Sequence, residues 1–174
     1  MQWKHDLSRS TEDFVRFVWP YISTACGGGK LKPVEGLVDN ALADDLDRLC
    51  GIDFWQAIDG TGCRGIASRV QWGTNWKTFT IRRSRDSGAR TEYEKLRAVI
   101  GRPGELIGPY LFSQAYVSEC RTRLLGCGVA RITDIMSTID GGRCNVRRTS
   151  NASFFVVQWS DVCGAKQFEM EFTS

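Results

Sequence analysis

The stretch IDFWQAIDGTGCRGIASRVQWGTNWKTFTIR, residues 52–82, decides the fold. It holds three runs rich in β-branched and aromatic residues, and a glycine-containing turn separates each run from the next. The runs cover residues 52–58, 65–72 and 76–82, and the turns are Asp59-Gly60-Thr61-Gly62 and Gly73-Thr74-Asn75. The stretch therefore predicts a three-strand meander.

Helices are expected on either side of this meander. Apolar residues at helical spacing predict one helix between residues 37 and 49. An earlier helix is predicted to start at the cap Ser10, to carry apolar residues on one face between 14 and 21, and to kink or end at Pro20. After the meander, Thr91 is followed by acidic residues and then by basic ones, which predicts a capped helix over residues 92–100. The segment YLFSQAYVSE, residues 110–119, is the expected fourth strand.

The last third of the chain is expected to add a helix and a hairpin. The helix is predicted over residues 129–139, and the hairpin from residues 154–159 and 167–172. The order of elements predicts one mixed α/β domain over residues 1–174. Its core covers residues 35–119, and residues 120–174 form an appended helix and β-hairpin.

Composition excludes several classes of protein. The chain has 174 residues, of which 42% are hydrophobic and 25% charged, so it carries enough apolar material for a core. These values exclude a disordered tail, a collagen-like repeat and a coiled coil. No run of 18 apolar residues occurs, and residues 1–14 lack an apolar stretch. We therefore expect no membrane partner and a cytoplasmic location.

Cysteine and histidine usage restricts the chemistry. The seven cysteines form no Cys-X-X-Cys pair, and His5 is the single histidine. This pattern favours reduced structural thiols, and we expect no zinc. A single histidine near the terminus also argues against a Ser-His-Asp or Cys-His enzyme.

Charge is divided into two blocks along the sequence. Residues 35–59 hold seven acids and one base, whereas residues 64–97 hold nine bases and three acids. One interpretation is pairing between neighbouring elements. The other is a phosphate-binding face beside a carboxylate cluster, because cations attract a polyanion and carboxylates hold Mg²⁺ against it. Tryptophans within the basic block can stack on bases.

The layout of polar residues on these elements resembles the PD-(D/E)XK (restriction-endonuclease-like) nuclease superfamily. The residues concerned are Gly51-Ile52-Asp53, the run IASRVQ at 66–71, FTIR at 79–82 and TEYEK at 91–95. The order helix, three-strand meander, helix, strand is similar to the common core of that superfamily. The resemblance implies a restriction-endonuclease-like core over residues 35–119.

The resemblance also implies roles for individual residues. Asp53 matches the first metal-binding acid, and Asp47 and Glu35 are accessory acids. With Arg69 at the cation position, Ala67 stands at the second acid position. With Gln71 as the ligand instead, the cation position falls on Gly73. Glu92 and Lys95 on the following helix are then expected to supply the missing acid and base. The implied metal ligands are Asp53, Glu92, Asp47 and Glu35, and the implied catalytic residues are Asp53, Arg69, Glu92 and Lys95.

Three functions follow as hypotheses. The first is a Mg²⁺-dependent endonuclease or exonuclease that acts on nucleic acid, with DNA as the expected partner. The second is a nucleic-acid-binding module with the same core and no catalysis. The third is a protein-interaction or inhibitory domain, and a homodimer stays open. For the first two, the expected contacts to nucleic acid are Arg82, Arg83, Arg85, Arg90 and Trp76.

Overall fold

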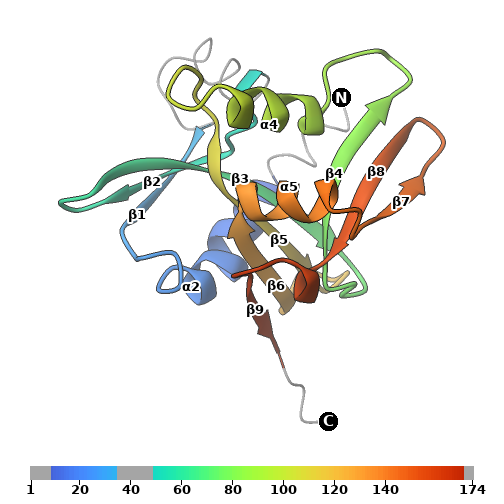
Figure 1. The fold of residues 1–174 in the computed structure, drawn as a ribbon. Coiled ribbons are helices and arrows are strands. Elements are labelled where there is room, and N and C mark those ends of the chain that lie inside the picture. Colours follow the sequence, from blue (N-terminus) through green and yellow to red (C-terminus); the bar gives the residue numbers. More distant parts are fainter. Residues whose placement is uncertain (1–8, 35–48, 171–174) are drawn as a thin grey trace.

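The chain forms a mixed α/β fold with two β-sheets in the computed structural model, which describes residues 9–34 and 49–170 (Figure 1). The larger sheet has six strands in the order β1-β2-β3-β5-β6-β9, and the smaller has three in the order β4-β8-β7. The larger sheet consists of β1 (Lys30–Pro33), β2 (Phe54–Ile58), β3 (Gly62–Trp72), β5 (Pro109–Val117), β6 (Leu124–Arg131) and β9 (Lys166–Glu169). The smaller sheet consists of β4 (Thr78–Arg85), β7 (Asn145–Arg148) and β8 (Ala152–Gln158).

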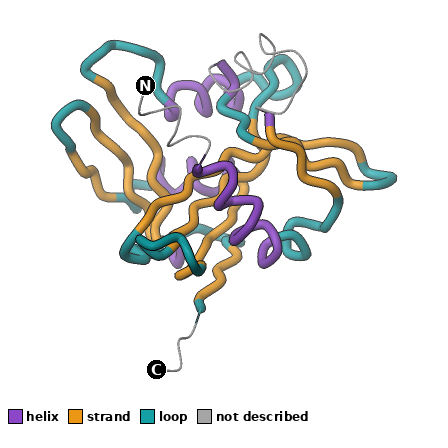
Figure 2. The backbone as a smooth tube through the Cα atoms, turned by 180° about the vertical axis from the view of Figure 1, so that it is seen from behind, coloured by secondary structure: helices purple, strands orange, loops and turns teal. Residues whose placement is uncertain are grey.

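Helices cover both faces of the larger sheet. An N-terminal segment, with the π-helical turn η1 (Phe14–Val18) followed by α2 (Trp19–Ile22), packs on one face (Figure 2). On the other face, α4 (Glu92–Gly101) and α5 (Ile132–Asp140) pack together with the smaller sheet, and the short η4 (Trp159–Asp161) follows β8. The two large hydrophobic cores therefore lie on opposite sides of the larger sheet, and β3, β5 and β6 contribute to both, while Val34 and Ile52 form a small third cluster.

The predicted meander is correct for its first two strands and wrong for the third. β2 and β3 pair antiparallel, but β4 leaves this sheet and pairs with β8. The chain turns out of the sheet at residues 73–77, where Lys77 adopts a positive φ of 53°. β5 then takes the place beside β3 in parallel register, because its side chains are buried along nearly the whole strand. An unpredicted strand, β1, pairs antiparallel with β2, so the meander consists of β1, β2 and β3.

The predicted elements of the C-terminal third also differ. The expected helix over 129–139 begins as the strand β6 and becomes α5 only at Ile132. The expected hairpin does not form, because β8 pairs with β7 and β4, whereas β9 pairs with β6. Residues 120–174 therefore supply strands to both sheets.

The predicted helix over 92–100 is confirmed as α4. Thr91 and Glu94 form a capping box, in which the Thr91 hydroxyl accepts from the Glu94 N–H and the Glu94 carboxylate accepts from the Thr91 N–H. The predicted helix over 37–49 lies almost entirely outside the described residues. Within the described ranges, no helix is both long and apolar enough to cross a membrane.

Candidate nucleic-acid interface

A groove of about 600 Å³ lies between β3 and the smaller sheet. The loop that connects β3 to β4 closes one end, where Trp72 and Trp76 line the wall. Arg69 of β3 and Arg147 of β7 lie toward the other end, beside Phe154 of β8. Other side chains of the lining are mainly threonine, glutamine and valine: Val70, Gln71, Thr74, Thr78, Thr80, Thr149, Val156 and Gln158. The surface of the groove is thus mainly apolar, with aromatic side chains at both ends, two arginines at one of them, and threonine and glutamine side chains between.

The strand registers explain why these side chains meet. In the smaller sheet, Arg82 of β4 and Arg147 of β7 both lie opposite Phe154 of the central strand β8. Side chains that are directly opposite across a ladder lie on the same face of a sheet. The guanidinium carbons of Arg69 and Arg82 lie 5.7 and 5.4 Å from the centre of the Phe154 ring. Three strands therefore bring arginines around one aromatic ring.

Glu92 is the acid that pairs with this arginine group. Its Oε2 accepts a hydrogen bond from Arg69 Nη2 at 3.0 Å and one from the backbone N–H of Arg82 at 2.9 Å. Arg69 also donates from Nη1 to Thr80 Oγ1 at 2.9 Å. Glu92 therefore fixes the position of Arg69 and joins the start of α4 to β3 and β4.

A buried hydrogen-bond network supports the floor of the groove. The Gln114 side chain on β5 accepts from the N–H and the hydroxyl of Thr80, at 2.7 and 2.9 Å. Its amide donates to Gln71 at 3.2 Å and to the Tyr116 hydroxyl at 2.9 Å, and that hydroxyl contacts Thr78. Burial raises the pKa of Tyr116, so the phenol stays neutral at ordinary pH. This network holds β4 against β5 and sets the shape of the groove.

Among residues 9–34 and 49–170, the positive charge near Phe154 exceeds the negative charge that contacts it. Burial lowers the pKa of Arg82, and the neighbouring Arg85 and Arg69 lower it further, while Glu92 acts in the opposite direction. The Nε atoms of Arg82 and Arg85 are buried and have no hydrogen-bond partner in the described part of the chain. Because an arginine in a protein keeps its proton, this group stores electrostatic repulsion that an anion would relieve.

The predicted metal ligands are placed only in part. Glu35 and Asp47 lie outside the described residues. Asp53 precedes β2, and its Oδ2 accepts from the backbone N–H of Ser68 at 2.5 Å. The Glu92 carboxylate contacts Arg69, which directly follows Ser68 on β3. Among residues 9–34 and 49–170, no three or more His, Cys, Asp or Glu side chains gather in a metal-binding arrangement.

The residues predicted to contact nucleic acid do not all lie at the groove. Trp76 lines the groove and is 59% exposed. A bulge in β4 follows Arg82, and Arg83 lies instead over Phe155, on the side of the smaller sheet that faces α4. Arg90 precedes α4 and donates weakly to the Glu94 carbonyl at 3.5 Å. Lys95 is half-buried on α4, and its side chain passes near Gly51.

Sequence reasoning missed the contribution of β7 and β8 to the groove. Arg147, Thr149 and Phe154 line it, although they are far in sequence from the basic block at residues 64–97. The apolar run FFVVQ over 154–158 is typical of a strand, but no local pattern indicates that it, or the pair Arg147-Arg148, faces the groove. No local pattern in the sequence indicates which strands pair with β7 and β8.

Comparisons with known proteins do not add to this description. The chain matches no protein-family model, and it matches no curated protein. The geometry of the groove and of the carboxylates beside it is therefore what indicates a function.

Proposed function

We propose that this protein binds single-stranded nucleic acid in the groove between β3 and the smaller sheet. The observation that carries the proposal is the group Arg69, Arg82 and Arg147 around Phe154. Arg69, Arg147 and Phe154 line one end of the groove, Arg82 lies behind them against the Phe154 ring, and the other end exposes Trp76. Arginine is well suited to phosphate, because its planar guanidinium donates in a fork. Exposed aromatic rings give unpaired bases a surface on which to stack. A single strand offers both groups at once.

Single strands are favoured over duplexes by the shape of the site. Bases in a duplex are already stacked on one another, so aromatic side chains inside a groove contact them only after unstacking. The ligand is expected to be DNA, and RNA presents the same phosphates and bases to these side chains. Both belong in the binding test.

The binding experiment measures fluorescence anisotropy of labelled oligonucleotides of about 12 nucleotides, as single-stranded DNA, single-stranded RNA and duplex DNA. We expect affinity to fall steeply with salt, with a slope of log K against log salt of about −0.7 for each phosphate that is neutralised. Arg82→Ala and Arg147→Ala should each make that slope shallower by about 0.7, which corresponds to the loss of one phosphate contact. Trp76→Ala should weaken binding by about 1–3 kcal/mol and leave the slope unchanged.

Arg97→Ala is the matched control, because Arg97 pairs with Asp140 outside the groove. It should change neither affinity nor slope beyond the effect of net charge. The proposal is wrong if none of the oligonucleotides binds at low salt, or if the groove variants bind as tightly as the Arg97 control.

We propose metal-dependent phosphodiester hydrolysis as the second candidate function. It is favoured by the positions of Asp53 and Glu92, whose carboxylates contact the consecutive residues Ser68 and Arg69 of β3. The antiparallel strands β1, β2 and β3, followed after the inserted strand β4 by α4 and then by β5 beside β3, also support a restriction-endonuclease-like core. Mg²⁺ would activate water and neutralise phosphate charge.

The cleavage test uses the same oligonucleotides with Mg²⁺ or Mn²⁺. Cleavage that is lost in Asp53→Asn and Glu92→Gln, while binding persists, would support hydrolysis. Binding without cleavage in the wild-type protein would exclude hydrolysis of these oligonucleotides and leave the binding proposal intact.

A further inference from the structure

A second basic cavity opens on the other side of the larger sheet. It has a volume of about 200 Å³ and lies where the segment after α2 approaches β3, β5, β6 and β9. Its lining is Ala25, Cys26, Arg64, Tyr110, Leu111, Val129, Ala130, Arg131, Gly164 and Lys166. Several of these, including Cys26, Leu111 and Val129, belong to the core under the N-terminal helical segment. We call this cavity the Tyr110 pocket, and it is separate from the groove.

Three cations surround the Tyr110 pocket. Within the described part of the chain, none of Arg64, Arg131 and Lys166 lies within ion-pair distance of a carboxylate. The carboxylate of Asp134 lies 3.9 Å from where a Cβ on Gly164 would stand, and it does not line the cavity. The pocket therefore concentrates positive charge in a space too small to hold a protein segment.

The protein holds the two arginines in place before any ligand binds. Arg64 donates from Nε to Gln56 Oε1 at 2.8 Å, and its Nη2 donates to the Cys26 carbonyl. The guanidinium carbons of Arg64 and Arg131 lie 5.2 and 5.8 Å from the centre of the Tyr110 ring. These contacts are with neutral groups, so they orient the cations and leave their charge uncompensated. Preorganisation of this kind reduces the entropy that binding would otherwise cost.

We propose that the Tyr110 pocket is a binding site for a phosphate group. A phosphate dianion matches the charge, because two guanidiniums and one ammonium offer several charge-assisted hydrogen bonds. The N-terminus of α5 immediately follows Arg131 and has no side-chain cap, which adds a favourable electrostatic potential at the edge of the pocket, and Asp134 in the first turn of the helix offsets part of it. The apolar walls from Leu111 and Val129 lower the local dielectric and strengthen each contact. This site does not depend on the function proposed for the groove.

The test measures binding of inorganic phosphate by isothermal titration calorimetry at about 0.15 M chloride, where weak surface attraction is screened. We expect saturable binding with a Kd of about 1 mM or tighter. Arg131→Gln and Lys166→Gln should each weaken binding about tenfold, and Asp134→Asn should strengthen it a few-fold. Arg97→Ala, on a surface remote from the pocket lining, should leave the Kd unchanged.

Two further ligands identify the source of the phosphate. Tighter binding of adenosine monophosphate or of a 5′-phosphorylated dinucleotide than of inorganic phosphate would assign the site to a nucleotide phosphate. Tightest binding of inorganic phosphate would assign it to the free ion. The proposal is overturned if inorganic phosphate at 10 times the expected Kd gives no saturable heat, or if the Arg131 and Lys166 variants bind as the wild type does. Arg64 is left unchanged in these variants, because its contacts with Gln56 and Cys26 are structural.

Discussion

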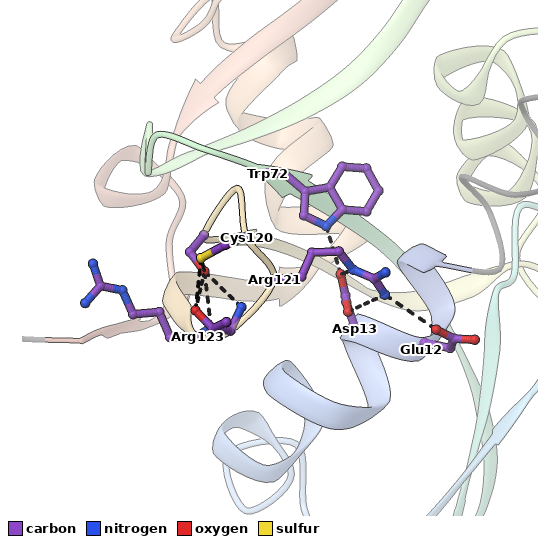
Figure 3. A network of polar contacts seen from close by, with 8 residues as sticks. Glu12, Asp13, Trp72, Cys120, Arg121 and Arg123 are labelled. Atoms are coloured by element: carbon purple, nitrogen blue, oxygen red, sulfur yellow. Dashed lines mark hydrogen bonds and ion pairs between the residues drawn. The ribbon is translucent and has the colours of Figure 1, made fainter.

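Arg121 holds both carboxylate oxygens of Asp13, although 108 residues separate the two in sequence (Figure 3). Arg121 Nε donates to Oδ2 at 2.8 Å and its Nη2 to Oδ1 at 2.9 Å, and the indole N–H of Trp72 donates to Oδ2 at 2.8 Å. Asp13 is only 2% exposed, whereas Arg121 lies in the turn between β5 and β6 with a positive φ of 55°. The pair ties the N-terminal helical segment to that turn and to the end of β3.

Replacing this buried carboxylate should be costly. Asp13→Asn removes the charge that compensates Arg121 and leaves a buried amide whose N–H₂ faces other donors. We expect the Tm to fall by at least about 5 °C. Glu12→Gln is the control, because Glu12 also contacts Arg121, at 3.4 Å, but its side chain is 68% exposed. Thermal unfolding followed by circular dichroism gives both values, and equal shifts for the two variants would contradict a structural role for Asp13.

Gly128 of β6 should tolerate no side chain. A Cβ at this position would stand 2.6 Å from Cε2 of Trp159, which is fully buried against the strand. Gly128→Ala should lower the free energy of unfolding by about 1–3 kcal/mol through overpacking. Gly101→Ala at the end of α4, with open space around it, should change it by less than about 0.5 kcal/mol. Urea unfolding measures both, and a neutral Gly128→Ala would show that the indole moves aside.

Glu92→Gln separates the two proposed functions. The variant removes a negative charge beside the groove and retains an acceptor for the N–H of Arg82. If the groove only binds nucleic acid, affinity should rise a few-fold at low salt. Asp140→Asn changes the net charge equally and frees Arg97 outside the groove, so it controls for total charge. A loss of affinity in Glu92→Gln, with stability unchanged, would show instead that the carboxylate is needed for the ligand to bind.

The cysteines should differ in their reactivity with iodoacetamide. Cys63, Cys120 and Cys163 are exposed, whereas Cys26 and Cys127 are buried. Hydrogen bonding with the hydroxyl of Ser118, and then with that of Thr122, lowers the pKa of Cys120, so more of it is thiolate at pH 7.5. Mass spectrometry of the native protein should find Cys120 modified first and the buried pair last. Modification of Cys127 as fast as Cys163 would contradict the packing described for β6.

The same buried thiols predict a loss of stability at alkaline pH. Burial raises the pKa of Cys26 to about 11 and that of Cys127 to about 12, from an ordinary value of 9.0. The folded state favours the neutral thiol, so this contribution is complete below pH 9 and is lost as pH rises toward 11 and 12. Urea midpoints measured from about pH 7.5 to pH 10.5 should fall less steeply in Cys127→Ala than in the wild type. Cys63→Ala, which changes an exposed thiol, should keep the wild-type slope.

Local signals in the sequence predicted where helices and strands occur better than they predicted which strands pair. The turn at Asp59-Gly60-Thr61 specified the β2–β3 hairpin, and Thr91 specified the start of α4, because both depend on a few neighbouring residues. β4 pairs with β8, which lies about 70 residues later in the chain, and no residue near β4 indicates this partner. The last three residues of β6, 129–131, were mistaken for helix and the rest of the strand was assigned to no element, because a short apolar run without clear alternation suits either structure.

The candidate site was predicted in its residue types but not in its assembly. Arg69 and Arg82 were identified because a cation on a strand needs a reason, Glu92 because the family resemblance lacks a second acid, and Trp76 because it lies within the basic block. The structure brings Arg69, Arg82 and Glu92 together. Arg83 was grouped with Arg82, but the bulge in β4 sends it to the other face. Arg147 and Phe154 reach the groove through tertiary pairing alone, so no local pattern distinguished them.

Successive side chains of β3 face opposite sides of the larger sheet, so residues cannot be inserted into or deleted from this strand without cost. Ile66 and Val70 face the core under the N-terminal helical segment, whereas Ala67 faces the opposite core and Arg69 the groove. One residue inserted in this strand would exchange the two sides for everything beyond it, placing a guanidinium among aliphatic side chains. Natural variants of this strand should therefore differ by substitution and keep its length, while insertions and deletions accumulate at the exposed hairpin tip around Gly60.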